Sequence, residues 1–77
     1  MFQFERITVD PNIMGGRPCI RGMRITAALV LNLLGGGMTF DEILRDYPYL
    51  ERQDIQEVLK YAAWLADENI VLLEQAA

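Results

Sequence analysis

The sequence predicts a mainly α domain, in which three helices form a helix-turn-helix-like unit preceded by a short N-terminal β-hairpin. Three observations support this prediction. Capping and staple patterns mark three helix starts between residues 25 and 55. Gly35-Gly36-Gly37 and Pro48 break the chain between those helices. Before residue 26, apolar and polar residues alternate around turn-forming glycine and proline, which is typical of short strands.

The 77 residues are predicted to form one domain. We divide it into N-terminal strands with a basic Gly/Arg turn (1–25), a three-helix core (26–68) and an apolar C-terminal tail (69–77). A domain of this size buries only about 60% of the surface that its unfolded chain exposes. Because so small a core is marginal by itself, we expect the chain to form a homodimer or to bind a partner.

Two short strands are expected in residues 1–25. Apolar residues spaced mostly by two predict the first strand around Arg6 to Val9. Pro18 cannot lie inside a helix, so we predict a second strand from Pro18 to Arg21 that pairs with the first as a hairpin. Gly22 then allows a turn with positive φ.

The first helix is predicted from Ala27 to about Leu34. Thr26 is its N-cap, and Ile25 and Val30 are placed as a hydrophobic staple. The helix is apolar on nearly all sides, so we expect it to be the central, buried one.

The second helix is predicted from Phe40 to about Asp46. Thr39 caps it, and Glu42 completes a capping box. Pro48 prevents its continuation. Its predicted core face consists of Phe40, Ile43, Leu44 and Tyr47.

The third helix is predicted from about Arg52 to Glu68, with Asp54 as an acidic residue in its first turn. Trp64 lies half a turn from the expected core side, where loops or a partner would cover it. The run Ile70 to Leu73 fits no helix pattern well, so an extra strand and a segment ordered by a partner both stay open. The expected core stripe consists of Ile55, Val58, Leu59, Ala62, Leu65 and Ala66.

The composition argues against a reaction centre. The chain has no histidine and one cysteine, Cys19, which excludes the usual zinc spacings and a histidine-based triad. Cys19 is expected to be a small buried hydrophobe. The glycine runs lack the lysine and serine or threonine of a phosphate-binding loop. We therefore predict no enzyme activity, catalytic residue, metal, cofactor or small-molecule substrate.

No segment is expected to enter a membrane. The longest apolar run, Ile25 to Leu34, contains Thr26 and Asn32 and is much shorter than the roughly 20 residues that a bilayer requires. The first residues also lack the layout of a signal peptide. We expect a cytoplasmic protein.

The net charge of −4 is distributed unevenly. Residues 1–38 carry four arginines against two acids, giving +2, whereas residues 39–77 carry three cations against nine acids, giving −6. Bulk charge therefore does not favour nucleic acid, and binding to DNA would depend on a local cluster or on a dimer.

The side of the third helix that faces away from the core carries residue types able to reach phosphates and base edges. A short second helix, a tight turn and a longer third helix is the layout of a module whose third helix enters the major groove of DNA. An ordinary solvated face is the alternative. The candidate residues are Arg52, Gln53, Gln56 and Lys60.

Several segments resemble the signature of the domain of unknown function 433 family. They are Gly16 to Ile25, which matches Gly-x-Pro-x-Ile-Arg-Gly-Thr-Arg-Ile except for Met23, then Gly37-Met38, Glu42 to Leu50 with its Tyr-Pro-x-Leu turn, and Asp54-Ile55. The resemblance implies a small bacterial helix-turn-helix protein. It also implies an antitoxin that binds a toxin resembling a PIN-domain ribonuclease and, with it, operator DNA.

This resemblance adds Arg17, Arg21 and Arg24 of the basic turn to the expected DNA-binding residues. We expect partner contacts, either in a homodimer or with the toxin, from Tyr61, Trp64, Ile70, Val71, Leu72 and Leu73. The alternative function is a protein interaction module with no role in DNA binding, in which the arginines pair with the acidic helices.

Overall fold

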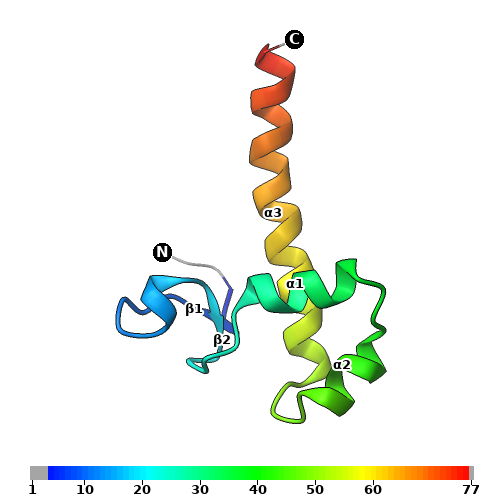
Figure 1. The fold of residues 1–77 in the computed structure, drawn as a ribbon. Coiled ribbons are helices and arrows are strands. Elements are labelled where there is room, and N and C mark those ends of the chain that lie inside the picture. The colour runs from blue at the N-terminus through cyan, green and yellow to red at the C-terminus, as the bar shows by residue number, and fades with distance from the viewer. Residues whose placement is uncertain (1–3, 77) are drawn as a thin grey trace.

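The computed structural model describes the backbone of residues 4–76 and the side chains of residues 4–67. Figure 1 shows two short strands followed by three helices. The elements are β1 (Ile7–Thr8), a 3₁₀ turn (Met14–Gly16), β2 (Cys19–Ile20), α1 (Ala27–Gly35), α2 (Phe40–Asp46) and α3 (Arg52–Ala76). The predicted fold class is confirmed.

The two strands form the predicted antiparallel hairpin, with Ile7 opposite Ile20 and Thr8 opposite Cys19. After β2 the chain turns back, because the Ile20 amide donates to the carbonyl of Ile25 at 2.9 Å. Two adjacent residues make this turn with positive φ, Arg21 at 44° and Gly22 at 73°. The prediction covered Gly22, but nothing in the sequence indicated that an arginine would adopt this disfavoured conformation.

The starts of α1 and α2 are capped as predicted, whereas at α3 the predicted first-turn acid, Asp54, itself makes the capping bond. The Thr26 hydroxyl accepts a hydrogen bond from the Leu29 amide at 3.0 Å. Thr39 and Glu42 form a complete capping box, which begins α2 at the predicted residue. At the start of α3, a carboxylate oxygen of Asp54 accepts from the Glu51 amide at 2.8 Å. These bonds satisfy amides that would otherwise lack a partner in the first turn of each helix.

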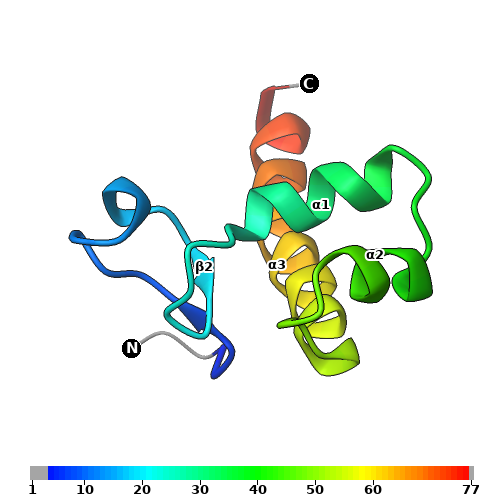
Figure 2. The same cartoon turned by 60° about the horizontal axis from the view of Figure 1, so that its bottom comes forward.

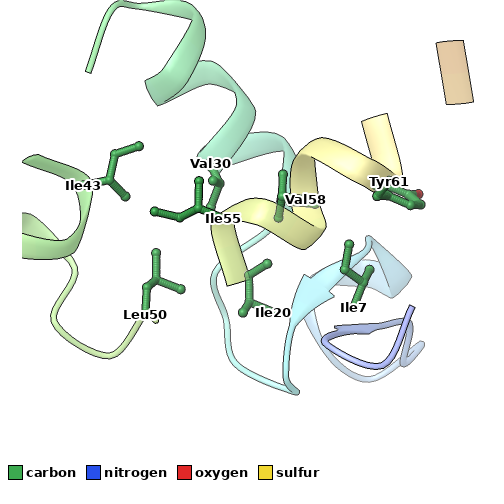
Figure 3. Close-up of a cluster of buried hydrophobic side chains, with 9 residues drawn as sticks. Ile7, Ile20, Val30, Ile43, Leu50, Ile55, Val58 and Tyr61 are labelled. Atoms are coloured by element: carbon green, nitrogen blue, oxygen red, sulfur yellow. The ribbon is translucent and has the colours of Figure 1, made fainter. Parts of the chain in front are cut away.

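The core lies where the hairpin, α1 and α2 meet the first half of α3, as Figure 3 shows. Each of these elements contributes at least one buried aliphatic side chain, so the hairpin belongs to the same core as the helices. The buried members are Ile7, Ile20, Ala27, Val30, Ile43, Leu50, Ile55, Val58 and Tyr61.

Helix α1 is less enclosed than predicted. Only Ala27 and Val30 are buried, whereas its leucines are partly exposed. In Figures 1 and 2, α1 crosses α3, and the side of α1 that faces away from α3 is not covered by another element. The apolar composition of α1 predicted a buried helix, but this small fold has too few elements to surround one.

The predicted core stripe of α3 is partly wrong. Ile55 and Val58 are buried, but Leu59 and Leu65 are 42% and 38% exposed, and Ala66 is exposed too. Asp54 and Tyr61 are buried in their place. The hairpin covers α3 on the side of these two residues, so the buried stripe is rotated toward the hairpin.

The predicted end of α3 at residue 68 is also wrong, because the helix continues to Ala76. No glycine or proline interrupts residues 52–76, and the single Asn69 costs less than about 1 kcal/mol in a helix. Residues 69–76 therefore continue α3, and neither an extra strand nor a separate tail forms there.

The length of α3 dominates the shape of the molecule. Its 25 residues span about 37 Å, compared with a longest extent of 43 Å for the chain. Figure 1 shows the C-terminal half of α3 projecting beyond the other elements. Within the described residues, no helix is both long and apolar enough to cross a membrane.

Candidate recognition surfaces

The predicted polar face of α3 is present at the surface. Arg52, Gln53, Gln56 and Lys60 are all exposed. They occupy the first half of the helix, directly after the turn that joins α2 to α3. The structure therefore brings these four residues together on one accessible face.

Arg52 is held in place by α2. Its guanidinium donates to a carboxylate oxygen of Asp41 and lies 5.3 Å from the centre of the Phe40 ring. Both the ion pair and the cation–π contact are at the surface, so each contributes about 1 kcal/mol or less. The ion pair neutralises part of the positive charge on this face.

The three arginines of the basic turn have different surroundings. Arg17 and Arg24 are exposed, and neither forms an ion pair with a described residue. Arg21 instead forms two hydrogen bonds with Asp54, from Nε to Oδ1 at 3.0 Å and from Nη2 to Oδ2 at 2.8 Å. Of the three, Arg17 and Arg24 keep their donors available for a ligand.

Asp54 is the centre of a buried ionic cluster that sequence analysis missed. Its side chain is 1% exposed. Besides the bonds from Arg21 and from the Glu51 amide, its Oδ1 accepts from Nη1 of Arg6 at 2.9 Å. Both carboxylate oxygens are therefore fully used, which is what a buried charge requires.

The charged form of Asp54 is favoured despite its burial. Desolvation raises the pKa of this carboxyl, but the hydrogen bonds from Arg21, the Glu51 amide and Arg6 outweigh it and lower the pKa below its ordinary value. Hydrogen bonds to Glu51 and Asp54 raise the pKa of Arg6, and those to Asp54 raise the pKa of Arg21. The three groups are therefore ionised together across the neutral range.

The cluster fastens the hairpin to the start of α3. Nη1 of Arg6 also donates to Oε1 of Glu51 at 2.8 Å, and the backbone amide of Arg6 donates to Oε2 of Glu57. Nη2 of Arg21 donates to the carbonyl of Tyr49, in the turn between α2 and α3, at 2.9 Å. An aspartate in a helix's first turn is visible in a sequence, but partners 33 and 48 residues away are not.

The residues predicted to contact a partner differ in their exposure. Tyr61 is buried, and Trp64 is 39% exposed. Both contact the ring of Phe4, with centroid distances of 5.5 Å and 5.8 Å. The segment before β1 thus provides the partial cover that was one of the two interpretations of Trp64. The side chains of Ile70, Val71, Leu72 and Leu73 lie outside the described residues.

Neither a metal-binding group nor a pocket occurs among the described residues. No group of three or more cysteine, aspartate or glutamate side chains among them is arranged to hold a metal ion. No pocket is found in the part of the chain that the structure describes. What the structure presents are surfaces: the polar face of α3, the arginines of the turn and the projecting half of α3.

Residues 7–62 match the family described as protein of unknown function (DUF433). The chain belongs to this family. The matched region contains the hairpin, the three helix starts and every residue of the ionic cluster around Asp54 except Arg6. It ends at the point where α3 leaves the core, so the family's pattern covers the compact part of the molecule.

A solved structure supports this assignment. The chain is similar to a DUF433 member protein from Anabaena variabilis, whose crystal structure is known, with 25% sequence identity and a TM-score of 0.74. The similarity covers 82% of this chain and 62% of that one, so the chain spans less than two thirds of the relative's length. No curated protein matches the chain. Membership of DUF433 establishes the fold but assigns no activity.

Proposed function

We propose that this DUF433 protein is an antitoxin-like regulator that binds operator DNA through the third helix of its helix-turn-helix, α3, and neutralises a toxin resembling a PIN-domain ribonuclease. The observation that carries the DNA-binding part is the exposed face of Arg52, Gln53, Gln56 and Lys60 at the start of α3. Helix-turn-helix proteins read base edges with the N-terminal residues of such a helix.

The residue types on this face suit two different contacts. Glutamine side chains hydrogen-bond to adenine edges in the major groove, and cations neutralise phosphates. Arg24 adds an exposed cation in the turn after β2, and Arg21 of the same turn donates to the carbonyl of Tyr49 between α2 and α3. Because the whole chain has a charge of −4, the attraction to DNA must come from these local cations.

DNA binding is tested with a duplex from the region upstream of the protein's own gene. We expect fluorescence anisotropy to show binding that weakens steeply between 50 and 200 mM salt, as counterion release requires. Lys60→Ala should reduce the slope of log binding constant against log salt concentration by about 1 for every duplex sequence. Gln56→Ala should instead reduce the discrimination between the operator and a scrambled duplex.

Arg45 provides the control, since it is an exposed arginine on α2 that we do not assign to the interface. An equal loss of affinity in Arg45→Ala and Lys60→Ala would indicate attraction by bulk charge. The absence of binding at 50 mM salt would remove the DNA-binding part of the proposal.

Toxin binding is favoured by a separate observation, the exposed apolar residues of α3. Leu59, Trp64 and Leu65 are each more than one third exposed; Leu59 lies in the part of α3 that packs on the core, and the other two follow the last described core residue, Tyr61. Apolar and aromatic residues of this kind are favoured at the centres of protein interfaces. We expect co-expression with a ribonuclease-like protein from a neighbouring gene to give a complex that Leu65→Glu weakens strongly and Asp67→Ala leaves intact.

The alternative is an interaction module with no role in DNA binding. The pairing of Arg21 and Arg6 with Asp54 favours it, since two arginines of the basic half are used inside the fold. It predicts that the toxin-like partner binds while the upstream duplex does not, at any salt concentration.

A further inference from the structure

We propose that Phe4 and Trp64 form one composite contact surface for the toxin. The segment before β1 holds the Trp64 ring on α3, and an apolar pocket on the toxin receives the two rings together. This inference rests on the proposed function, since the partner is the same toxin. It adds Phe4, which was not among the residues expected to contact a partner.

Three aromatic rings meet where α3 leaves the compact part of the molecule. The centre of the Phe4 ring lies 5.5 Å from that of Tyr61, at an interplanar angle of 83°, and 5.8 Å from that of Trp64, at 60°. The ring centres of Tyr61 and Trp64 are 6.0 Å apart. Aromatic pairs attract one another at these distances and edge-on angles. Trp64 is therefore held by a ring from the segment before β1.

The segment that carries Phe4 is fixed along one side of α3. The Ile7 amide donates to the Phe4 carbonyl at 3.2 Å, which closes a turn before β1. Within this turn, Arg6 binds α3 through its guanidinium and through its backbone amide. Residues spaced by three or four lie on one side of a helix, so these contacts follow α3 over successive turns. The contacted residues are Asp54, Glu57, Tyr61 and Trp64.

The contact between the rings leaves both of them accessible to a partner. Trp64 is 39% exposed, and Phe4 is only partly buried. A lid would have buried the indole, so we interpret the two rings as a shared surface. Tryptophan is enriched among the residues that dominate binding energy in protein interfaces. A side chain that is already fixed in the free protein also loses less conformational entropy on binding.

Both rings lie outside the region that matches the family. The match spans residues 7–62, so Phe4 precedes it and Trp64 follows it. These two flanks meet in space, although the whole matched region separates them in the sequence. The matched region supports the common fold, whereas a contact with a member's own toxin is expected in residues that the shared pattern does not include.

The charge near Trp64 indicates what kind of surface the toxin offers. Residues 61–77 carry three acids and no lysine or arginine. Because complementary potentials favour association, the apolar pocket that receives the rings is expected to be flanked by lysine or arginine side chains. Charges at the rim of an interface act mainly on the association rate, so loss of a single acid should leave the complex intact. The three acids are Asp67, Glu68 and Glu74.

A double-mutant cycle on toxin affinity tests the inference by calorimetric titration, with the ribonuclease-like protein from the neighbouring gene as the probe. We expect Trp64→Ala and Phe4→Ala each to weaken binding at least about tenfold. In the Trp64→Ala background, Phe4→Ala should weaken binding less than about twofold, because the two rings act through each other. Tyr49→Ala is the matched control, since Tyr49 is an aromatic residue that is 76% exposed in the turn between α2 and α3. It should change the affinity less than about twofold.

The outcomes separate this inference from the proposed function. Losses for Phe4→Ala and Trp64→Ala no larger than that for Tyr49→Ala, while Leu65→Glu still weakens the complex, would overturn the inference and leave the proposed function standing. Equal losses for Phe4→Ala in both backgrounds would also overturn it. If the two variants prevent self-association and leave toxin affinity unchanged, the surface belongs to a second copy and the inference is wrong. Absence of wild-type binding to the toxin would overturn both.

The fluorescence of Trp64, the only tryptophan in the chain, separates positioning from a general loss of stability. In free Phe4→Ala we expect acrylamide to quench this emission more strongly than in the wild type. Phe4→Leu keeps an apolar side chain but removes the ring contacts. It should therefore retain most of the stability in urea denaturation and still show stronger quenching and weaker toxin binding, and it replaces Phe4→Ala if that variant does not fold. Affinity that falls only with stability, without a change in quenching, would contradict the inference.

Discussion

At the scale of single residues, Asp54 connects elements that are distant in the sequence. Its carboxylate joins β1, the turn after β2 and the start of α3, because Arg6, Arg21 and the Glu51 amide all donate to it. A buried ion pair is weak evidence for stability in itself, but removing one partner is costly because the others are left uncompensated. Besides the apolar contacts of Ile7 and Ile20, the hairpin is therefore held to α3 by one charged side chain.

The low pKa of Asp54 predicts acid sensitivity. Its stabilising contribution is present above the unfolded-state pKa of about 3.9 and is lost as the pH falls through the lower folded-state pKa. We expect Asp54→Asn to lower the free energy of unfolding at pH 7 by about 3 kcal/mol. The difference from the wild type should shrink between pH 5 and pH 2, measured by urea denaturation. Asp41→Asn, which removes an exposed pair, should cost at most about 1 kcal/mol at pH 7.

Gly22 should be required for its backbone conformation and not for space. A Cβ placed there meets no atom within 4 Å, but its φ is 73°. We therefore expect Gly22→Ala to destabilise the protein by about 1–2 kcal/mol in thermal unfolding. Gly35→Ala is the control, since Gly35 lies in α1 and a Cβ there also meets no atom within 4 Å. This change should stabilise the protein by up to about 1 kcal/mol. A neutral Gly22→Ala would contradict the conformational explanation.

At the scale of elements, the helices are set by local signals. Each start is fixed by a hydrogen bond between residues three apart, and Gly36 and Gly37 follow the end of α1. These devices act within one or two turns of helix, so they can be read from the sequence without knowledge of the fold.

The capping box of α2 provides a test at this scale. Thr39→Ala should destabilise the protein by about 1 kcal/mol, because the Glu42 amide loses its acceptor. Thr39→Ser keeps the hydroxyl and should retain most of the stability. Equal loss in the two variants, measured by thermal unfolding, would show that the hydroxyl is not what matters.

What sequence reasoning missed depended on contacts between distant residues. The exposed sides of α1 follow from the small number of elements in the fold, whereas the rotated stripe of α3 and the pairs of Arg6 and Arg21 with Asp54 follow from where the hairpin packs. No local pattern encodes that placement. The end of α3 was missed for a different reason: the run Ile70 to Leu73 lacks an amphipathic pattern, but nothing in residues 69–76 breaks a helix that has already begun.

At the scale of the whole molecule, the protein consists of a compact unit and a projecting helix. Among the side chains of α3 that the structure describes, up to Asp67, the last buried one is Tyr61, and those from Ala63 to Asp67 are exposed. The family match ends at residue 62, close to the same point. An isolated helix of about 12–15 residues is marginal in water, so the projecting part gains stability if a partner packs against it.

Truncation after Asp67 separates these two parts. We expect the shortened chain to keep the near-ultraviolet circular dichroism of the compact unit, since the described core lies before residue 62. Light scattering at micromolar concentration should show a dimer for the full chain and a monomer after truncation. A full-length monomer would contradict the homodimer expected from the sequence, whereas a dimer that survives truncation would place the interface elsewhere.

Backbone NMR spectra recorded during titration with the upstream duplex test DNA recognition most directly. We predict chemical-shift changes at low salt that concentrate in residues 22–24 and 52–60 and that disappear when the salt concentration is raised. No shift at low salt, or shifts confined to residues 62–67, would contradict recognition of DNA through α3.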